Sequence, residues 1–306
     1  MTRVAAIDCG TNSIRLLIAD VESVGLTDVV REMRIVRLGQ GVDRTGRLAP
    51  EALERTRVAL AGYAAQIGEH GAQRVRMVAT SATRDAANRD QFVAMVRAEL
   101  GVDPEVITGQ QEAALTFAGA ASALDEVDGV PLLVVDIGGG STELVRGDAA
   151  GEPLRAHSMD VGCVRMTERH LRDDPPTAEQ VAATIADVRT AVHAARADVP
   201  LSGELRFVGV AGTVTTVAAI ALGLGRYDPD LIHGSVLTAE QVAAVTEQLL
   251  QMTHEQRALL PVMHPGRVDI IGGGALVLRT LVEETGVHQV VASEHDILDG
   301  IALSLG

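Results

Sequence analysis

The sequence predicts an α/β protein made of two similar domains, and three observations support this expectation. Residues 7–17 recur as residues 135–145, at a constant offset of 128 residues from Asp8 to Asp136 and from Ser13 to Ser141. A length of 306 residues is typical of two domains. Each half also shows strands joined by tight turns, followed by helices and strands in alternation.

The repeated segment has the form of a phosphate-binding loop. In each copy an apolar strand brings an Asp to its end, and glycines leave the next backbone amides open to an anion. A Ser then adds a hydroxyl before the chain returns as a second strand. Two such hairpins facing across a cleft could hold a polyanion, so we expect the functional site in an interdomain cleft.

The elements of the first domain follow in order. Residues 3–40 are predicted to form short strands in a meander, and a helix over 50–67 begins at Pro50. Strand and helix then alternate: a strand over 75–79, a helix from about Arg84, a strand over 105–108 and a helix over 111–124. We place the first domain at residues 1–125.

The second domain, residues 126–306, opens near a polar junction at 125–131 that contains Gly and Pro. Strands are predicted to about Val161, followed by helices over 163–171 and 178–197, the latter capped by Thr177 with Gln180 three residues on. Strand-turn-helix units are expected from Leu205 and from Val268, and a strand over 289–292 leads to a C-terminal helix. That helix, 296–306, is expected to be able to pack back on the first domain.

Composition and charge exclude several classes of function. The chain is 47% hydrophobic and 22% charged, as globular proteins are, and its net charge of −15 without any basic run argues against nucleic acid. Asp8 interrupts the only early apolar run, which argues against a secretory signal. A buried strand-turn-helix explains the uncharged stretch 208–225 better than a membrane span. We expect a cytoplasmic protein with no nucleic-acid or membrane partner.

The basic residues and cysteines limit the chemistry further. The chain has no lysine, so all 26 basic residues are arginines, which excludes the lysine-dependent P-loop and Schiff-base catalysis. Phosphate contacts must come from backbone amides, hydroxyls, arginines and a divalent metal. Cys9 and Cys163 are too few for a disulfide framework, and small buried side chains are favoured over a redox-sensitive site.

Four further segments have the strand, small-residue turn, helix form that directs amides at an anion: 79–84, 162–165, 209–216 and 272–275. Each alone is a weak signal, but with the two hairpins, in a chain without lysine, they indicate phosphate binding. The nine histidines show no metal-ligand spacing, so zinc is not expected. His233 is placed for a loop role, although a solvated or core histidine explains it better.

Acidic residues supply the candidates for catalysis and metal binding. Glu112 lies in the first turn of a predicted helix, either as a partner of the helix dipole or as a general base for a water in line with a terminal phosphorus. Asp8, Asp136 and Glu143 offer hard oxygen ligands that suit Mg²⁺ or Mn²⁺. The alternative for the two Asp residues is turn stabilisation.

The chain resembles the exopolyphosphatase and guanosine pentaphosphate phosphatase family, within the actin, sugar kinase and Hsp70 superfamily. The resemblance covers the whole chain. The segments that carry it are 8–15, 79–88, 109–113, 136–143, 162–165, 211–213, 233–234 and 272–275.

The resemblance implies two actin-like, ribonuclease H-like domains with the active site in the cleft between them, and a homodimer. It implies Mg²⁺-dependent removal of the terminal phosphate of inorganic polyphosphate, with guanosine pentaphosphate or tetraphosphate as a possible further ligand. By position, Glu112 and Arg84 take catalytic roles, while Asp136 and Glu143, beside Asp8, take the acidic metal positions. The residues expected at the phosphates are Asn12, Ser13, Arg15, Thr83, Gly138, Gly139, Gly140, Ser141, Gly212 and Thr213.

The chain departs from the family at two points. Where the family often shows Ser-x-x-Gly-Leu-Arg-Glu-Gly, residues 293–300 have Leu298 in place of the Arg. Longer members append a helical region that helps to hold long polyphosphate, whereas this sequence ends at Gly306. We therefore expect a preference for short chains.

Alternative functions stay open beside the exopolyphosphatase. Guanosine pentaphosphate hydrolysis uses the same chemistry, but five aromatic residues and no Trp offer little for a base-binding pocket. A kinase or ATPase would hold adenosine at 272–275 and would need an acceptor site. A sensor would bind polyphosphate or an alarmone without turnover, against which Glu112, Asp136 and Glu143 argue.

Overall fold

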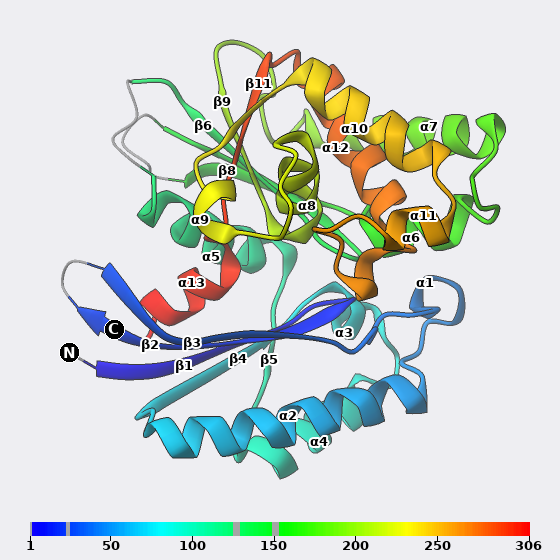
Figure 1. Cartoon of the computed structure of the whole chain (residues 1–306). Helices are drawn as coiled ribbons and strands as arrows, with labels where there is room; N and C mark the ends of the chain where they lie inside the picture. The colour runs from blue at the N-terminus through cyan, green and yellow to red at the C-terminus, as the bar shows by residue number, and fades with distance from the viewer. Residues whose placement is uncertain (1, 23–24, 125–128, 149–152) are drawn as a thin grey trace. The chain divides into compact units, whose positions relative to one another are not determined.

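The computed structural model describes residues 2–22, 25–124, 129–148 and 153–306, which form two units (Figure 1). Unit 1 consists of Met1–Ser122 and Asp296–Gly306, and unit 2 of Ala123–His295. Most of the polar junction expected at 125–131 lies outside the described residues. The interdomain cleft stays a prediction, and each unit has a sheet and cores of its own.

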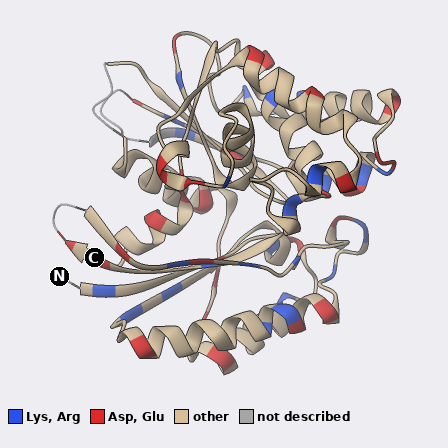
Figure 2. Ribbon diagram, viewed as in Figure 1, with Lys and Arg blue, Asp and Glu red and all other residues tan. Residues whose placement is uncertain are grey.

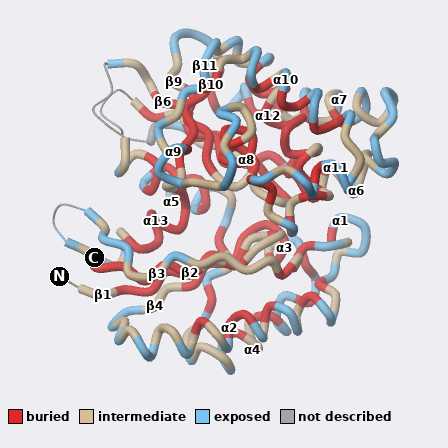
Figure 3. Tube along the Cα trace, viewed as in Figure 1, coloured by how far each residue is buried: buried red, intermediate tan, exposed pale blue. Residues whose placement is uncertain are grey.

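The sheet of unit 1 contains five strands in the order β3-β2-β1-β4-β5. Their bounds are β1 (Thr2–Cys9), β2 (Ser13–Glu22), β3 (Gly25–Ile35), β4 (Arg74–Ala79) and β5 (Glu105–Val106). The first three strands are antiparallel neighbours, and β4 pairs parallel to β1. Most of β1 and β2 is buried (Figure 3), because both faces of the sheet are covered.

Helices cover both faces of this sheet. They are α1 (Val42–Thr45), α2 (Pro50–His70), α3 (Ser81–Asp85), α4 (Arg89–Leu100), α5 (Gly109–Ser122) and α13 (Ile297–Leu303). Alternate residues of β1 separate two cores: Ile7 packs in the one that includes α2 and α4, and Ala6 in the one that includes α13. Figure 1 shows α2 and α4 on the face opposite α13. Leu298, the departure from the family pattern, lies in the second core with 1% exposure.

The helices α5 and α13 cross in close contact at two glycines. A Cβ added at Gly119 would lie 1.8 Å from the carbonyl oxygen of Asp296, and one at Gly300 would lie 1.9 Å from that of Leu115. Only glycine permits this approach. The crossing fixes the N-terminus of α13 beside the helix that carries Glu112.

The sheet of unit 2 contains six strands in the order β10-β11-β9-β6-β7-β8. They are β6 (Leu132–Ile137), β7 (Thr142–Gly147), β8 (Pro153–Met159), β9 (Arg206–Val210), β10 (Val236–Thr238) and β11 (Gln289–Ala292). As in unit 1, the first three strands are antiparallel neighbours, and the fourth pairs parallel to the first. This shared order is that of the actin-like, ribonuclease H-like domain, so the predicted α/β class is confirmed.

The helices of unit 2 pack a single large core against one face of its sheet. They are α6 (Cys163–His170), α7 (Ala178–Ala195), α8 (Ala211–Ala221), α9 (Pro229–Ile232), α10 (Ala239–Gln251), α11 (His254–Ala258) and α12 (Ile271–Thr285), with the 3₁₀ turn η1 (Pro265–Arg267). The core joins α7, α8, α10 and α12 to alternate residues of β6. The predicted capping box of Thr177 and Gln180 is confirmed at the start of α7.

Several predicted elements differ from the structure. The helix expected from about Arg84 is two helices, α3 and α4, and the strand expected over 105–108 is only two residues long. The strand expected from Val268 was wrong, because η1 and a turn lead directly into α12. The stretch 208–225 forms β9 and α8 as predicted, and α8 carries no charge, in contrast to α2 (Figure 2). Within the described residues, no helix combines the length and apolar character that a membrane span requires.

Candidate functional site

The first hairpin turns between β1 and β2 at residues 10–12. The amide of Gly10 donates to the carbonyl oxygen of Ser13 at 2.9 Å, which closes the turn. Amides from the following segment brace it from outside: Arg37 donates to the Asn12 oxygen at 2.8 Å, and Gly39 to the Thr11 oxygen at 2.8 Å. The predicted phosphate residues Asn12 and Ser13 are only partly buried here, so they remain accessible to a ligand.

Strand register places Arg15 directly opposite Asp8. The guanidinium donates twice to Asp8 Oδ2, at 3.0 Å from Nε and 2.7 Å from Nη2, and a third bond runs from Nη1 to Asp296. Burial raises the pKa of Asp8, and the charge of Arg15 opposes that rise. Arg15 is bonded inside the protein in this structure, so its predicted contact with phosphate stays a prediction.

Hydroxyl groups gather where β4 passes into α3. The hydroxyls of Thr11 and Ser81 lie 2.9 Å apart, which joins the first hairpin to this turn. Thr83, a predicted phosphate residue, is fully buried, and its hydroxyl has no hydrogen-bond partner among the described residues. Because Thr83 is buried in this structure, its predicted contact with phosphate stays a prediction.

Glu112 and Arg84, the two residues predicted to be catalytic, form a hydrogen bond in the structure. Glu112 lies in the first turn of α5 with 7% exposure, and Arg84 Nη1 donates to its Oε2 at 3.1 Å. The same nitrogen donates to the carbonyl oxygen of Ile107 at 3.0 Å, at the end of β5. Nε and Nη2 of Arg84 have no partner among the described residues, and the side chain is 24% exposed. One side of the guanidinium orients Glu112, and the other is open to an anion.

The second hairpin repeats the backbone of the first. The amide of Gly138 donates to the Ser141 oxygen at 3.0 Å, the equivalent of the Gly10 bond in unit 1. Among the described residues the amides of Gly139 and Gly140 have no acceptor, so two donors of the glycine loop are open to an anion. Ser141 is buried, which leaves the predicted phosphate contact of this loop to its backbone.

Backbone amides at the start of α6 donate hydrogen bonds to the carbonyl oxygens of the glycine loop. Cys163 donates its amide to the Gly138 oxygen at 3.0 Å, and Val164 to the Gly139 oxygen at 2.9 Å. The prediction that residues 162–165 direct amides at an anion was therefore wrong, because the loop itself accepts these bonds. A Cβ at Gly162 would lie 2.5 Å from the Gly139 oxygen, so this close support requires glycine.

Strand register aligns three polar residues across the second hairpin. Asp136 lies opposite Glu143, and Glu143 lies opposite Ser158 on β8. Both acids are buried, and Ser158 Oγ donates to Glu143 Oε1 at 2.7 Å. The sequence analysis missed Ser158, because only the pairing of β7 with β8 reveals its position.

Gly212 and Thr213 occupy the start of α8, immediately after β9. Ala211 has a φ of 66°, a left-handed conformation that is strained for a residue with a side chain. The N-cap residue, Val210, cannot cap the helix, so the first amides of α8 are available to an anion. A Cβ at Gly212 would lie 2.2 Å from Arg267 Nη2, so a guanidinium that the sequence analysis missed packs on this turn.

Residues 272–275 form part of the helix α12 and pack against its neighbours. A Cβ at Gly273 would lie 2.5 Å from Thr167 Oγ1 on α6, and one at Gly274 would lie 2.5 Å from Thr213 Oγ1 on α8. These residues form the first turn of α12 and not a loop before it, and their glycines let helices approach closely; the predicted contact with an anion or adenosine stays a prediction. Thr213 accordingly directs its hydroxyl toward α12.

The two cysteines are buried, and His233 packs against another histidine. Burial raises the pKa of Cys163 to about 11, against a hydrogen bond with Thr213, and burial raises the pKa of Cys9 well above its ordinary value. Both thiols therefore stay protonated near neutral pH, which favours the small buried side chain over the redox site. The ring of His233 packs edge-on against that of His295, with centroids 4.8 Å apart.

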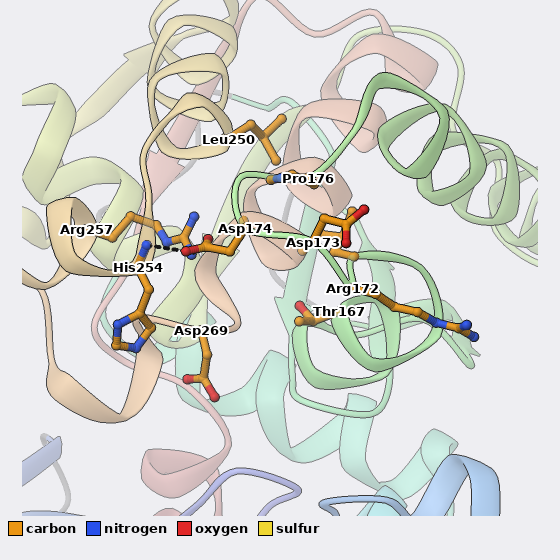
Figure 4. Close-up of a pocket in the computed structure, with 12 residues that line it drawn as sticks. Thr167, Arg172, Asp173, Asp174, Pro176, Leu250, His254, Arg257 and Asp269 are labelled. Atoms are coloured by element: carbon orange, nitrogen blue, oxygen red, sulfur yellow. Dashed lines mark hydrogen bonds and ion pairs between the residues drawn. The ribbon is translucent and has the colours of Figure 1, made fainter.

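A hollow of about 230 Å³ in unit 2 is lined by other residues (Figure 4). Arg257 forms part of its wall and bonds Asp174 and the carbonyl oxygens of Met252 and Val268. The amide of His254 donates to the second Asp174 oxygen at 2.5 Å. Arg257 and Asp174 are therefore bonded to each other, and Gly272 and Gly273 of the predicted anion segment 272–275 line the hollow as well.

The second hairpin fits a divalent cation better than the first. Asp136 and Glu143 lie opposite each other on adjacent strands and offer two hard oxygen donors, the ligand type that a divalent cation such as Mg²⁺ prefers. Asp8 instead has Arg15 opposite. Among the described residues, no three acidic, His or Cys side chains gather closely enough to enclose a metal by themselves. Water or substrate oxygens would complete such a site, as is usual for Mg²⁺.

Comparison with known proteins places the chain in a family. Residues 17–305 match the model of the Ppx/GppA phosphatase family. Exopolyphosphatase 2 of Mycobacterium tuberculosis is 53% identical, with 100% of this chain and 99% of that protein covered. A solved exopolyphosphatase-like protein is 46% identical over 100% of this chain and 98% of its own, with a TM-score of 0.97. A Ppx/GppA family member from Aquifex aeolicus is 31% identical over 99% and 97%, with a TM-score of 0.83. The chain belongs to the Ppx/GppA phosphatase family.

Proposed function

We propose that this protein is an exopolyphosphatase, which hydrolyses the terminal phosphoanhydride bond of inorganic polyphosphate. The observation that carries the proposal is the pair of Glu112 and Arg84, in which a buried carboxylate is oriented by a guanidinium with two free nitrogens. The 53% identity to exopolyphosphatase 2 of Mycobacterium tuberculosis supports the choice of substrate.

Glu112 would act as the general base. Its carboxylate accepts a proton from water as the water oxygen attacks the terminal phosphorus. The bond from that phosphorus to the bridging oxygen breaks, and the shortened polymer leaves with the electron pair. The products are orthophosphate and a chain one phosphate shorter.

Arg84 would contact both the general base, Glu112, and the terminal phosphate of the substrate. Nη1 holds Glu112 and the Ile107 oxygen, so the free Nε and Nη2 could donate to oxygens of the terminal phosphate. A single planar group would thereby set the base and the phosphorus relative to one another. Lysine could not replace it, because a single ammonium lacks this fork of donors.

The second hairpin would contribute phosphate binding and the metal. The open amides of Gly139 and Gly140 suit phosphate oxygens, and Asp136 and Glu143 are the residues that would hold Mg²⁺, or Mn²⁺ in its place. The cation, when bound, neutralises negative charge on the phosphate oxygens. Asp8, paired with Arg15, would act chiefly by positioning the first hairpin.

The alternatives differ in what the structure offers them. A kinase would need residues 272–275 to hold adenosine, and these residues form the first turn of α12, which packs against α6 and α8. Guanosine pentaphosphate hydrolysis would use the same Glu112 and Arg84, so only the substrate separates it from the polyphosphatase. The preference for short chains and the homodimer stay predictions, to be tested by a chain-length series and by sedimentation.

The test is phosphate release from short-chain polyphosphate and, separately, from guanosine pentaphosphate, with Mg²⁺ or EDTA. We expect Mg²⁺-dependent release, faster from polyphosphate, that falls roughly hundredfold or more in both Glu112→Gln and Arg84→Lys. The matched control is Glu99→Gln, which breaks another Arg–Glu pair of unit 1, also at 3.1 Å. Binding without release in the wild type would indicate a sensor, and faster release from guanosine pentaphosphate would reassign the substrate.

A further inference from the structure

All three guanidinium nitrogens of Arg15 donate hydrogen bonds to two carboxylates of unit 1. Nε and Nη2 donate to Asp8 Oδ2, and Nη1 donates to Asp296 Oδ2. Arg15 is 20% exposed, and the two acids are buried. A cation at the start of the first hairpin is therefore satisfied within the protein.

Asp296 reaches Arg15 from the C-terminal helix. It is the N-cap of α13, where its Oδ1 accepts the amide of Leu298 at 3.0 Å while Oδ2 bonds Arg15. The close crossing of α5 and α13 at Gly119 and Gly300 fixes this end of the helix. The position of the carboxylate is therefore set by helix packing and does not depend on Arg15.

The charges of this cluster oppose an anionic ligand. Two carboxylates and one guanidinium leave a net negative charge beside the turn at residues 10–12. Asp8 alone holds Arg15 by two bonds, so the bond to Asp296 is not needed to keep the side chain in place. A phosphate oxygen and the Asp296 carboxylate would compete for the same nitrogen, Nη1.

We infer that Asp296 sets the affinity of the first hairpin for polyphosphate by withholding Nη1 of Arg15 from the substrate. Asp296 is a positioning residue in this role, because it acts through Arg15. The inference rests on the proposed function, since it names a residue that weakens binding of the same anionic substrate.

Two substitutions at position 296 separate the charge from the helix cap. Ser keeps an N-cap acceptor but is too short to reach Arg15, whereas Asn keeps an acceptor for both bonds and removes the charge. We expect the Asp296→Ser variant to bind tripolyphosphate roughly three- to tenfold more tightly than the protein with Asp296 does. The affinity of the Asp296→Asn variant should lie between the two. Calorimetric titration in a Glu112→Gln background measures this affinity without turnover.

A double-mutant cycle tests the role of Arg15. Adding Arg15→Gln to Asp296→Ser should abolish the gain in affinity, and added KCl should reduce the gain because the new contact is electrostatic. Asp20→Asn is the matched control, since buried Asp20 on β2 bonds Arg3 at 2.8 Å instead of Arg15. This control should lower the melting temperature and leave the affinity unchanged.

Unchanged or weaker binding by Asp296→Ser, or a gain that persists without Arg15, would overturn the inference. Melting curves of every variant show whether a change in affinity reflects loss of folding. Absence of phosphate release by the wild type would count against the proposed function alone, because the calorimetric comparison does not require turnover.

Discussion

The two hairpins share a backbone turn but differ in the residue opposite the strand-end Asp. In unit 1 Asp8 faces Arg15, and the next residue across the sheet is Met33. In unit 2 Asp136 faces Glu143, and the next residue is Ser158. The residue opposite the strand-end Asp is therefore basic in the first hairpin and acidic in the second.

We propose that this difference gives the repeated backbone two different roles. The first hairpin is bonded within its own unit through Arg15 and Asp296, and the same unit carries the proposed catalytic pair of Glu112 and Arg84. The second hairpin presents open glycine amides and two carboxylates. Their supports differ as well, because the segment around Gly39 braces the first turn and the start of α6 braces the second.

The largest expected effect comes from giving the second hairpin the charge pattern of the first. Glu143→Arg would pair with Asp136 and remove the site for a divalent cation, so we expect Mg²⁺-dependent phosphate release to fall roughly hundredfold or more. The control is Arg146→Gln, on the same strand, whose side chain bonds, within the described part of the chain, the carbonyl oxygens of Pro200 and Ser202. Substantial activity in Glu143→Arg would mean that the acid pair is not the metal site.

Replacing the residue opposite the strand-end Asp by Gln should affect the free energy of unfolding differently in the two hairpins. Arg15→Gln leaves two buried carboxylates without their cation and should cost about 3 kcal/mol in the free energy of unfolding. Glu143→Gln removes one of two adjacent acids and, in EDTA, should cost less than about 1 kcal/mol or stabilise the protein. Urea titration measures both, and equal losses would contradict the comparison.

The glycine that packs against the loop of the second hairpin should not tolerate a larger side chain. Gly162→Ala places a Cβ against the carbonyl oxygen of Gly139, so we expect roughly a tenfold loss of activity as the glycine loop shifts. Gly272→Ala is the control, because its Cβ would make an ordinary contact at 3.5 Å with Leu250. Loss of activity in Gly272→Ala would restore the predicted anion loop at 272–275.

A smaller effect is expected at Ser158, which orients one oxygen of Glu143. Ser158→Ala should reduce kcat about three- to tenfold and weaken apparent Mg²⁺ affinity, because the carboxylate loses its hydrogen bond. Ser158→Thr keeps a hydroxyl and should retain most of the activity. If Ala and Thr reduced activity equally, packing rather than the hydrogen bond would explain the loss.

The smallest effect is expected from the two cysteines beside the hairpins. With the pKa of Cys163 raised to about 11 from 9.0, its thiolate fraction at pH 8 is about a hundredfold below that of an ordinary thiol. The native protein should therefore react slowly with a disulfide reagent at pH 8 and rapidly once unfolded in urea. Fast modification of the native protein would show that a thiol is exposed and reactive.

The sequence predicted features that depend on local pattern. The constant offset of 128 residues reflects equivalent strand registers, and the Thr177 capping box and the first-turn position of Glu112 followed from neighbouring residues. Features that depend on packing were missed. Glycines at 272–275 have the same composition in a ligand loop as in a helix contact, and only the neighbours α6 and α8 distinguish them.

Long-range partners account for the rest of the differences. Ser158 and Asp296 reach Glu143 and Arg15 from 15 and 281 residues away, so no local pattern links them. The family resemblance placed Arg15 at the phosphates, and that contact stays a prediction. Its bonds to Asp8 and Asp296 depend on the pairing of the strands and the packing of α13. The amides of residues 163–165 were expected to bind an anion, but they donate their hydrogen bonds to carbonyl oxygens of the glycine loop.

The most direct test of the difference between the hairpins is Mn²⁺ binding, followed by the paramagnetic resonance signal of the free ion without substrate. We expect Glu143→Gln to weaken binding by about tenfold or more and Asp8→Asn to change it less than about twofold. Equal weakening by both substitutions, or weakening by Asp8→Asn alone, would contradict the assignment of the metal to the second hairpin.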